Sequence, residues 1–163
     1  MKDDNLDDAD RRILEALQSE GRLSNSDLAE RTGMSTSPCW RRTRRLEEEG
    51  YIQRYQATID RKRLGLDVLV FVLVQIDTHS EAEAAAFEKA VASFSQVASC
   101  YSIGGGCDFL LQVVCKNLDE YADFSMTQLR RLPGIKAMTS NFVLKDIKSF
   151  EGWPIPKANG GAG

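Results

Sequence analysis

The sequence predicts an α+β fold in two domains, with three helices and a strand in the first domain and a βαββαβ unit in the second. Two patterns predict this fold. Short helical segments separated by glycine precede residue 50, and strand patterns alternate with helical ones after residue 67. A chain of 163 residues, 42% apolar and 28% charged, is long enough for two small globular domains. We place the first domain at residues 1–60, a linker at 61–67, the second domain at 68–150 and a tail at 151–163.

The first domain begins with a helix that Asp7 can cap and that runs to about Gln18. Ser24 begins a second helix, because its hydroxyl and the carboxylate of Asp27 form a capping-box pattern. Gly33 ends this helix, and a third helix begins around residues 35–37, with Pro38 tolerated in its first turn. Two short helices joined by such a tight turn indicate a helix-turn-helix.

The third helix carries arginines on the face opposite its apolar side. Cys39, Thr43 and Leu46 recur at helical spacing and are expected to pack inward. Guanidinium groups fit phosphate oxygens and the guanine edge, and a helix fits the major groove of DNA. The alternative is a solvated surface helix whose arginines pair with the acids at positions 47–49. We expect a recognition helix bound to double-stranded DNA, with contacts from Ser35, Thr36, Ser37, Trp40, Arg41, Arg44, Arg45 and Arg54.

The segment after this helix predicts a wing and then a linker. Residues 51–60 are rich in β-branched and aromatic side chains, which favours a strand or an extended wing from which Arg54 reaches the phosphate backbone. A basic run at 61–63 leads to Gly65, where we expect the hinge. The net charge of −3 does not exclude DNA binding, because acids crowded between Asp3 and Asp10 lie apart in sequence from the arginine helix.

The second half predicts a ferredoxin-like domain. Residues 68–76 form a nearly continuous β-branched strand, Ser80 and Glu83 form a capping box for a helix, and residues 97–103 and 108–115 are strands on either side of a glycine-rich turn. Asn117 caps a second helix, and residues 137–147 form the last strand. The βαββαβ order covers one sheet face with two helices and leaves the other open. An open apolar face predicts a homodimer made by this domain.

The remaining composition predicts neither an enzyme nor a metal centre. The four cysteines, at 39, 100, 107 and 115, lack the spacing of zinc ligands, and the chain has a single histidine, His79. No nucleophile and base occur at a recognised spacing. The most apolar stretch, 68–76, is far shorter than the roughly 20 residues of a membrane span. We expect free thiols, no cofactor, and a cytoplasmic protein without a membrane partner.

The glycine-rich turn at 104–106 is the candidate ligand site. Three glycines leave backbone amides uncovered for a carboxylate, while Asp108 offers a charge for an ammonium group, so together they fit a free amino acid. The alternative is a hairpin that needs glycine only for its turn, with Asp108 bonded to its own backbone. We expect effector contacts from Tyr101, Gly105, Gly106, Cys107, Asp108 and Phe109.

Motifs along nearly the whole chain resemble those of the Lrp/AsnC, or feast/famine, family of regulators. In the first half the matching residues are Leu6-Asp7, Asp10, Ile13-Leu14, Leu17-Gln18, Gly21-Arg22, Leu28-Ala29, Gly33, Ser35, Pro38-Cys39, Arg42, Arg45-Leu46-Glu47, Gly50 and Ile52. In the second half, Gly105, Asp108 and Phe109 match the family's ligand motif, although many relatives carry an acid where this chain has Gly106.

The resemblance implies a winged helix-turn-helix followed by a domain that dimerises, assembles to tetramers or octamers, and binds an amino acid between dimers. It also implies that the last strand begins near the glycine turn, which adds Thr139 and Ser140 to the expected effector contacts. The function implied is regulation of genes for amino-acid metabolism or transport. An effector-independent architectural DNA-binding protein is the alternative.

Overall fold

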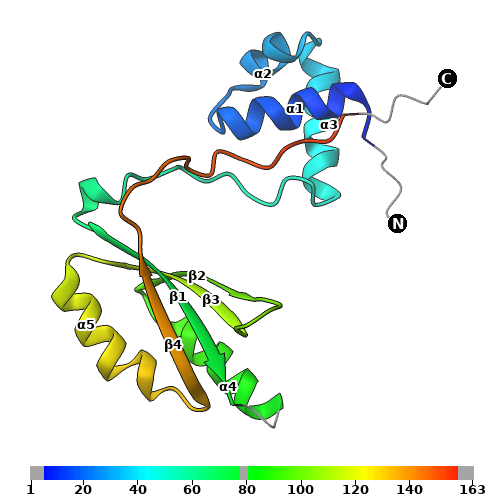
Figure 1. Ribbon diagram of the computed structural model, residues 1–163. Helices are drawn as coiled ribbons and strands as arrows, with labels where there is room; N and C mark the ends of the chain where they lie inside the picture. Colours follow the sequence, from blue (N-terminus) through cyan, green and yellow to red (C-terminus); the bar gives the residue numbers. More distant parts are fainter. Residues whose placement is uncertain (1–5, 78–80, 158–163) are drawn as a thin grey trace. The chain divides into compact units, whose positions relative to one another are not determined.

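The chain folds into two compact units (Figure 1). The computed structural model describes residues 6–77 and 81–157, and for residues 81–83 it describes the backbone alone. One unit contains the chain up to Thr58 together with the chain from Lys148 onward, and the other contains Ile59–Ile147. The polypeptide therefore passes from one unit to the other twice.

The first unit contains three helices, α1 (Asp8–Ser19), α2 (Asn25–Thr32) and α3 (Thr36–Glu48). The predicted caps are confirmed: Asp7 and Ser24 both form capping boxes, and Gly33 ends α2 in the left-handed conformation at φ 69°. Inward packing of α3 is confirmed as well. The helices enclose a small apolar core made of Ile13, Ala16, Leu28, Ala29, Cys39 and Leu46.

We expected the wing as a strand or as an extended segment, and the strand is not observed. Residues 53–60 carry no strand, and the part of this unit that the structure describes offers them no strand to pair with. A β-branched segment forms a ladder only beside another extended segment, and all four strands belong to the second unit. The segment is instead an irregular connection in which most side chains are exposed.

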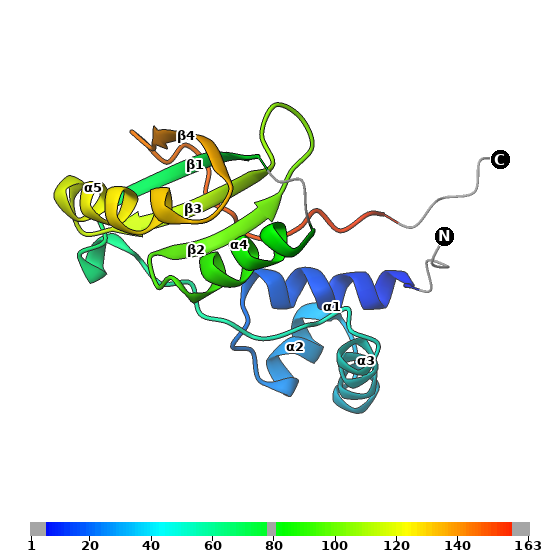
Figure 2. The same ribbon diagram turned by 90° about the horizontal axis from the view of Figure 1, so that it is seen from below.

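The second unit is a four-stranded antiparallel sheet with two helices. After a short 3₁₀ turn, Lys62–Leu64, the elements are β1 (Val68–Ile76), α4 (Glu81–Ser93), β2 (Val97–Ser102), β3 (Phe109–Cys115), α5 (Leu118–Thr127), a second 3₁₀ turn, Leu129–Arg131, and β4 (Ile135–Phe142). The strand order β2-β3-β1-β4 confirms the ferredoxin-like topology. Figures 1 and 2 show α4 and α5 on the same face of this sheet.

Strand alternation separates a core face from an open face. Val70, Val72 and Val74 of β1 pack with alternate residues of β3 and with Phe87 and Phe124 of the helices. The other face carries side chains that are only partly covered within this unit, among them Phe71, which is 36% exposed, and Tyr101, which is 57% exposed. The predicted division into a covered face and an open face is therefore confirmed.

The ends of β4 differ in detail from the prediction. β4 begins at Ile135 and ends at Phe142, whereas we expected residues 137–147. The last pair of the ladder is Val70–Phe142, and beyond it the Val143 amide donates to the Leu69 carbonyl at 2.9 Å. Asn117 caps α5 as predicted, accepting the Glu120 amide at 2.8 Å, whereas the predicted cap at Ser80 lies outside the described residues.

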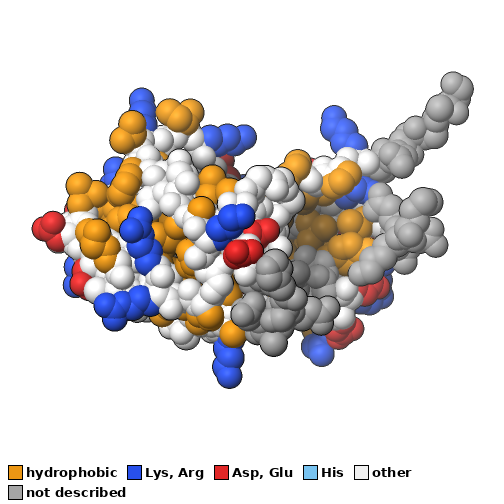
Figure 3. Space-filling model, turned by 60° about the horizontal axis from the view of Figure 1, so that its bottom comes forward, with side chains coloured by type: hydrophobic (Ala, Val, Ile, Leu, Met, Phe, Trp, Pro, Cys, Tyr) orange, Lys and Arg blue, Asp and Glu red, His pale blue; other side chains and the backbone are white. Residues whose placement is uncertain are grey.

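The surface mixes apolar and charged side chains. Figure 3 shows groups of hydrophobic side chains between single lysine and arginine side chains on one face of the molecule. The large apolar side chains with the greatest exposure lie after β4: Leu144, Ile147, Phe150 and Trp153 are 97%, 84%, 69% and 75% exposed.

Candidate DNA interface and candidate effector site

Helix α3 presents a polar, basic surface opposite its buried side. Ser35, Thr36 and Ser37 are exposed around its first turn, and Arg41 follows one turn later with no hydrogen bond or ion pair to any described residue. Arg44 is also exposed. Its Nε lies 2.9 Å from Glu48 Oε1, and its guanidinium carbon lies 5.6 Å from the centre of the Trp40 ring. Exposed pairs of this kind are weak, so both guanidinium groups remain available to an anion.

Arg45 lies elsewhere than expected. Its Nη2 is 2.5 Å from Oδ2 of Asp10, and Nη1 of Arg42 is 2.9 Å from Oδ1 of the same carboxylate. The Asp10 side chain is only 1% exposed. Because positions 42 and 45 flank the buried stripe of α3, their long side chains reach back to α1 rather than out to solvent. Arg45 thus anchors the helix that carries Arg41 and Arg44.

Asp7 completes this ionic cluster. Its Oδ2 lies 2.7 Å from Nη1 of Arg42. The amide of Asp10, which donates to the Asp7 carboxylate, and the charge of Arg42 together hold the pKa of Asp7 below its usual value, and the two carboxylates raise the pKa of Arg42. The cap of α1 and the orientation of α3 therefore depend on the same group of charges.

The start of the connection to the second unit lies against α3. The Tyr55 hydroxyl donates to Glu47 Oε1 at 2.7 Å, and burial together with this bond raises the pKa of Tyr55 to about 12. Tyr55, Trp40 and Arg44 are among the residues that line a pocket of about 270 Å³. Arg54, the neighbour of Tyr55, is exposed. The anchored Tyr55 keeps this segment beside α3 although no wing strand forms.

The glycine turn joins β2 to β3 and fixes Asp108 at its end. Gly105 has φ 129°, which favours glycine, and Gly104 and Gly106 are exposed as well. Oδ2 of Asp108 accepts the Ile76 amide at 2.8 Å, and its own amide donates to Val74 at 2.9 Å. The carboxylate is therefore tied to the end of β1, beside an open turn with uncovered backbone.

Not all of the other expected effector contacts lie near the glycine turn. Cys107 is half-buried in the turn, and Tyr101 is exposed on the open sheet face. Thr139 is exposed on β4 but is separated from β3 by β1, since Leu73 pairs with both Thr139 and Leu110. The strand order β2-β3-β1-β4 decides this separation.

Two expected contacts point to the helix-covered face instead. Phe109 is 5% exposed, and its ring centre lies 4.6 Å from that of Phe87. Ser140 hydrogen-bonds to the hydroxyl of Tyr121 on α5. Because side chains alternate along a strand, residues next to an exposed position belong to the core face. We therefore assign Phe109 and Ser140 to packing.

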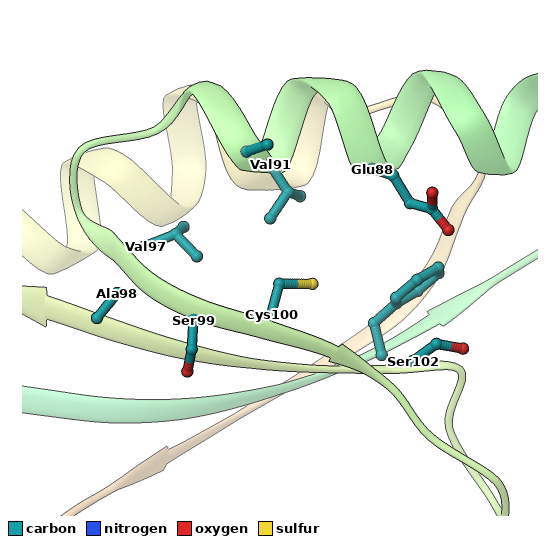
Figure 4. Close-up of a pocket in the computed structure, with 9 residues that line it drawn as sticks. Glu88, Val91, Val97, Ala98, Ser99, Cys100 and Ser102 are labelled. Carbon is teal, nitrogen blue, oxygen red and sulfur yellow. The ribbon is translucent and has the colours of Figure 1, made fainter. Parts of the chain in front are cut away.

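A hollow between α4 and β2 was not found from the sequence. It measures about 470 Å³, and Figure 4 shows Glu88 and Cys100 pointing toward the same space. Burial and the charge of Glu88 raise the pKa of the Cys100 thiol. The sequence offers only a weak indication of this pocket, namely that Cys100 and Ser102 alternate along an edge strand. The pocket becomes apparent only when the helix that faces this strand is known.

The described residues contain no cluster of three or more His, Cys, Asp or Glu side chains that can hold a metal ion. All four cysteines are free thiols. No helix in the described ranges is both long and apolar enough to cross a membrane.

Two family profiles match the chain. The winged helix-turn-helix DNA-binding profile matches residues 6–53, and the Lrp/AsnC ligand binding domain profile matches residues 69–153. The two matches correspond to the three helices with their exposed arginines and to the sheet with its glycine turn.

Similar proteins extend over both units. The Bkd operon transcriptional regulator of Pseudomonas aeruginosa is 42% identical over 142 residues, covering 87% of this chain and 93% of the relative. A leucine-responsive regulatory protein of Rhizobium meliloti is 37% identical, covering 88% of this chain and 92% of the relative. A transcriptional regulator from Neisseria meningitidis in complex with L-Met has a TM-score of 0.88 at 34% identity, over 91% of this chain and 96% of that one.

Proposed function

Because the chain belongs to the Lrp/AsnC family of transcriptional regulators, we propose that it binds specific double-stranded DNA sites through α3 and that an amino acid bound by the second unit controls this binding. Members of this family are regulators, not enzymes. The observation that carries the proposal is the contrast along α3, where Arg42 and Arg45 are held by Asp10 while Arg41 and Arg44 face outward. We propose a cytoplasmic regulator of genes for amino-acid metabolism or transport.

In this proposal Arg41 and Arg44 contact base edges or phosphates, while Ser35, Thr36 and Ser37 contact the backbone near the start of the helix. Two such helices in a dimer read half-sites about one helical turn apart or a multiple of it. Arg54 contacts the phosphate backbone from the segment that Tyr55 holds beside α3.

The test is a gel-shift titration on the chain's own promoter region. If Arg41 contacts a base, Arg41→Ala should weaken specific binding by about 1–3 kcal/mol. If Arg41 contacts a phosphate, the variant should instead reduce the slope of log binding constant against log salt concentration by about one. Arg22→Ala is the matched control, since Arg22 is exposed in the same unit but outside α3. Equal affinity of both variants and the parent would remove α3 from the interface. Steep salt dependence without sequence preference would instead favour an architectural DNA-binding protein.

We further propose that the effector is an α-amino acid with an apolar side chain. The amides of the glycine turn suit its carboxylate, and Asp108 suits its ammonium group. The leucine-responsive relative and the L-Met complex of a related regulator support an apolar side chain. Tyr101 and Thr139 are both exposed on the open face but lie on strands that are not neighbours, so they complete one site only if a second subunit covers that face.

The effector test is a thermal-shift screen against the twenty amino acids. A true effector should raise the melting temperature of the parent and of Asp123→Asn, an exposed acid on α5, but not of Asp108→Asn. An unchanged shift in Asp108→Asn would place the site elsewhere.

Assembly completes the proposal. We propose a homodimer packed through the open sheet face around Phe71, Leu73 and Leu110, which assembles further to a tetramer or octamer. Leu110→Glu should reduce the mass measured by light scattering, while Glu88→Lys on the opposite face should not. A parent that is monomeric at working concentrations would refute this part.

A further inference from the structure

The chain that follows β4 is held against α1 by hydrogen bonds to its backbone. Nε2 of Gln18 donates to the carbonyl of Trp153 at 3.0 Å, and Oε1 of Gln18 accepts the Trp153 amide at 2.6 Å. Arg11, which is 6% exposed, donates to the carbonyls of Leu6 and Pro156. One face of α1 thus holds two points of the C-terminal segment.

The site on α1 requires a glycine in the segment. Gly152 has φ 137°, and a Cβ added there would lie 2.7 Å from Oε1 and 2.9 Å from Cδ of Gln18. A side chain at this position would displace the glutamine that makes both hydrogen bonds. Glycine therefore permits the close approach of this backbone to α1.

Hydrogen bonds, rather than apolar burial, hold the segment. Phe150 and Trp153 stack edge to face with ring centres 5.0 Å apart, but they remain 69% and 75% exposed. Little apolar surface is removed from water at these rings, so the loss of a few polar contacts should release the segment.

We propose that residues 152–156 are a positioning element of the DNA-binding unit, so that the chain connects its two units twice, once through residues 53–60 and once through the tail bound to α1. The same helix holds α3, because Asp10 bonds Arg42 and Arg45 while its neighbour Arg11 holds the tail. The tail and the recognition helix are therefore held by neighbouring residues of one helix. This inference does not depend on the identity of the effector or the operator.

The test cuts the first connection and asks whether the second holds. A recognition sequence for a site-specific protease is inserted between Gln56 and Ala57, which are exposed, and the cleaved full-length protein is passed over a sizing column. The fragment that carries α1, α2 and α3 should co-elute with the fragment that carries the sheet and the tail. Gln18→Ala should release it. Each hydrogen bond that is lost lowers the association constant of the two fragments by roughly fivefold. The loss of both bonds of Gln18 should therefore lower it by about 25-fold.

Three further variants make the outcome decisive. A chain ending at Ile147 should release the helical fragment, while Gln128→Ala, on an exposed glutamine of the second unit, should retain it. Gln18→Glu keeps an acceptor for the Trp153 amide but loses the donor, so retention should fall by only about fivefold. Far-UV circular dichroism of each uncut variant checks that the helices are intact.

Hydrogen exchange gives a second, independent readout. The Trp153 amide should be protected in the parent and in Gln18→Glu, and should exchange rapidly in Gln18→Ala. Separation of the cut parent, retention by the chain ending at Ile147, or equally fast exchange of Trp153 in the parent and Gln18→Ala would each overturn the proposal.

Discussion

Asp10→Asn tests whether the buried carboxylate of α1 orients the recognition helix. Asparagine preserves the volume of the side chain, but it removes the charge and replaces one of the two acceptor oxygens, which face Arg42 at 2.9 Å and Arg45 at 2.5 Å, with an amide donor. One arginine then keeps a weaker hydrogen bond and the other loses its acceptor, so at about 1.5–3 kcal/mol for a hydrogen bond to a charged partner the cost is about 3 kcal/mol.

The partial exposure of the two arginines reduces the free-energy cost of Asp10→Asn. The Asp10 side chain is 1% exposed, but those of Arg42 and Arg45 are 33% and 37% exposed, so water partly replaces the lost partner. The variant also weakens the capping box, in which Asp10 accepts the Asp7 amide at 3.2 Å. We expect the first unit to lose about 2 kcal/mol of unfolding free energy.

Urea titration followed by far-UV circular dichroism measures this loss, and gel shift measures its effect on DNA affinity. Asp8→Asn is the matched control, because Asp8 is an exposed acid in the first turn of the same helix. It should cost only a few tenths of a kcal/mol through the helix dipole. If Asp10→Asn is no more destabilising than Asp8→Asn, the two ion pairs contribute nothing and Arg45 has no anchoring role.

Other expected outcomes concern single groups. Spectrophotometric titration should show one tyrosine ionising near pH 12; Glu47→Gln should lower the pKa of Tyr55 only in part, because burial is the larger cause. Since the folded state raises this pKa, the stabilisation from Tyr55 is complete below about pH 10 and is lost as the pH rises toward 12; an identical alkaline unfolding profile for Tyr55→Phe would contradict this. Gly33→Ala, at φ 69°, should cost roughly 1 kcal/mol in a urea melt, whereas Gly21→Ala, which meets only an ordinary contact at 3.8 Å, should be close to neutral. Cys115, 1% exposed and with its pKa raised to about 11 mainly by burial, should resist alkylation until the protein is denatured, while the exposed Cys100 reacts in the folded state; mass mapping that finds Cys115 labelled first would refute the packing of β3.

The elements of the fold were predictable where their signals are local. A cap depends on residues three positions apart, so Asp7, Ser24 and Asn117 were recognisable without tertiary information. β1 was predicted at its observed bounds, Val68–Ile76, because a β-branched run of that length with breakers on both sides has few other solutions. The inward stripe of α3 followed from helical spacing alone.

Predictions that depended on pairing with a segment distant in the sequence were less accurate. The wing segment carried the composition of a strand but finds no strand to pair with among the described residues of its unit. β4 ends at Phe142 rather than at residue 147. Thr139 and the glycine turn were expected to lie together, but the strand order places β1 between β4 and β3. Neither pairing nor register can be read from one segment, because each is a property of two.

The sequence by itself determined the helix-turn-helix, the βαββαβ order and the surface on which α3 carries its arginines, since these follow from spacing, caps and turns within short stretches. Only the tertiary structure decided which of the four arginines of α3 remain free. Asp10 lies more than thirty positions from Arg42 and Arg45 in the sequence, but in the folded chain its carboxylate bonds these two. The same holds for Gln18 and Trp153, which are separated by 135 positions. Long side chains and backbone amides act over a few ångströms, and only the folded chain brings such groups within that distance.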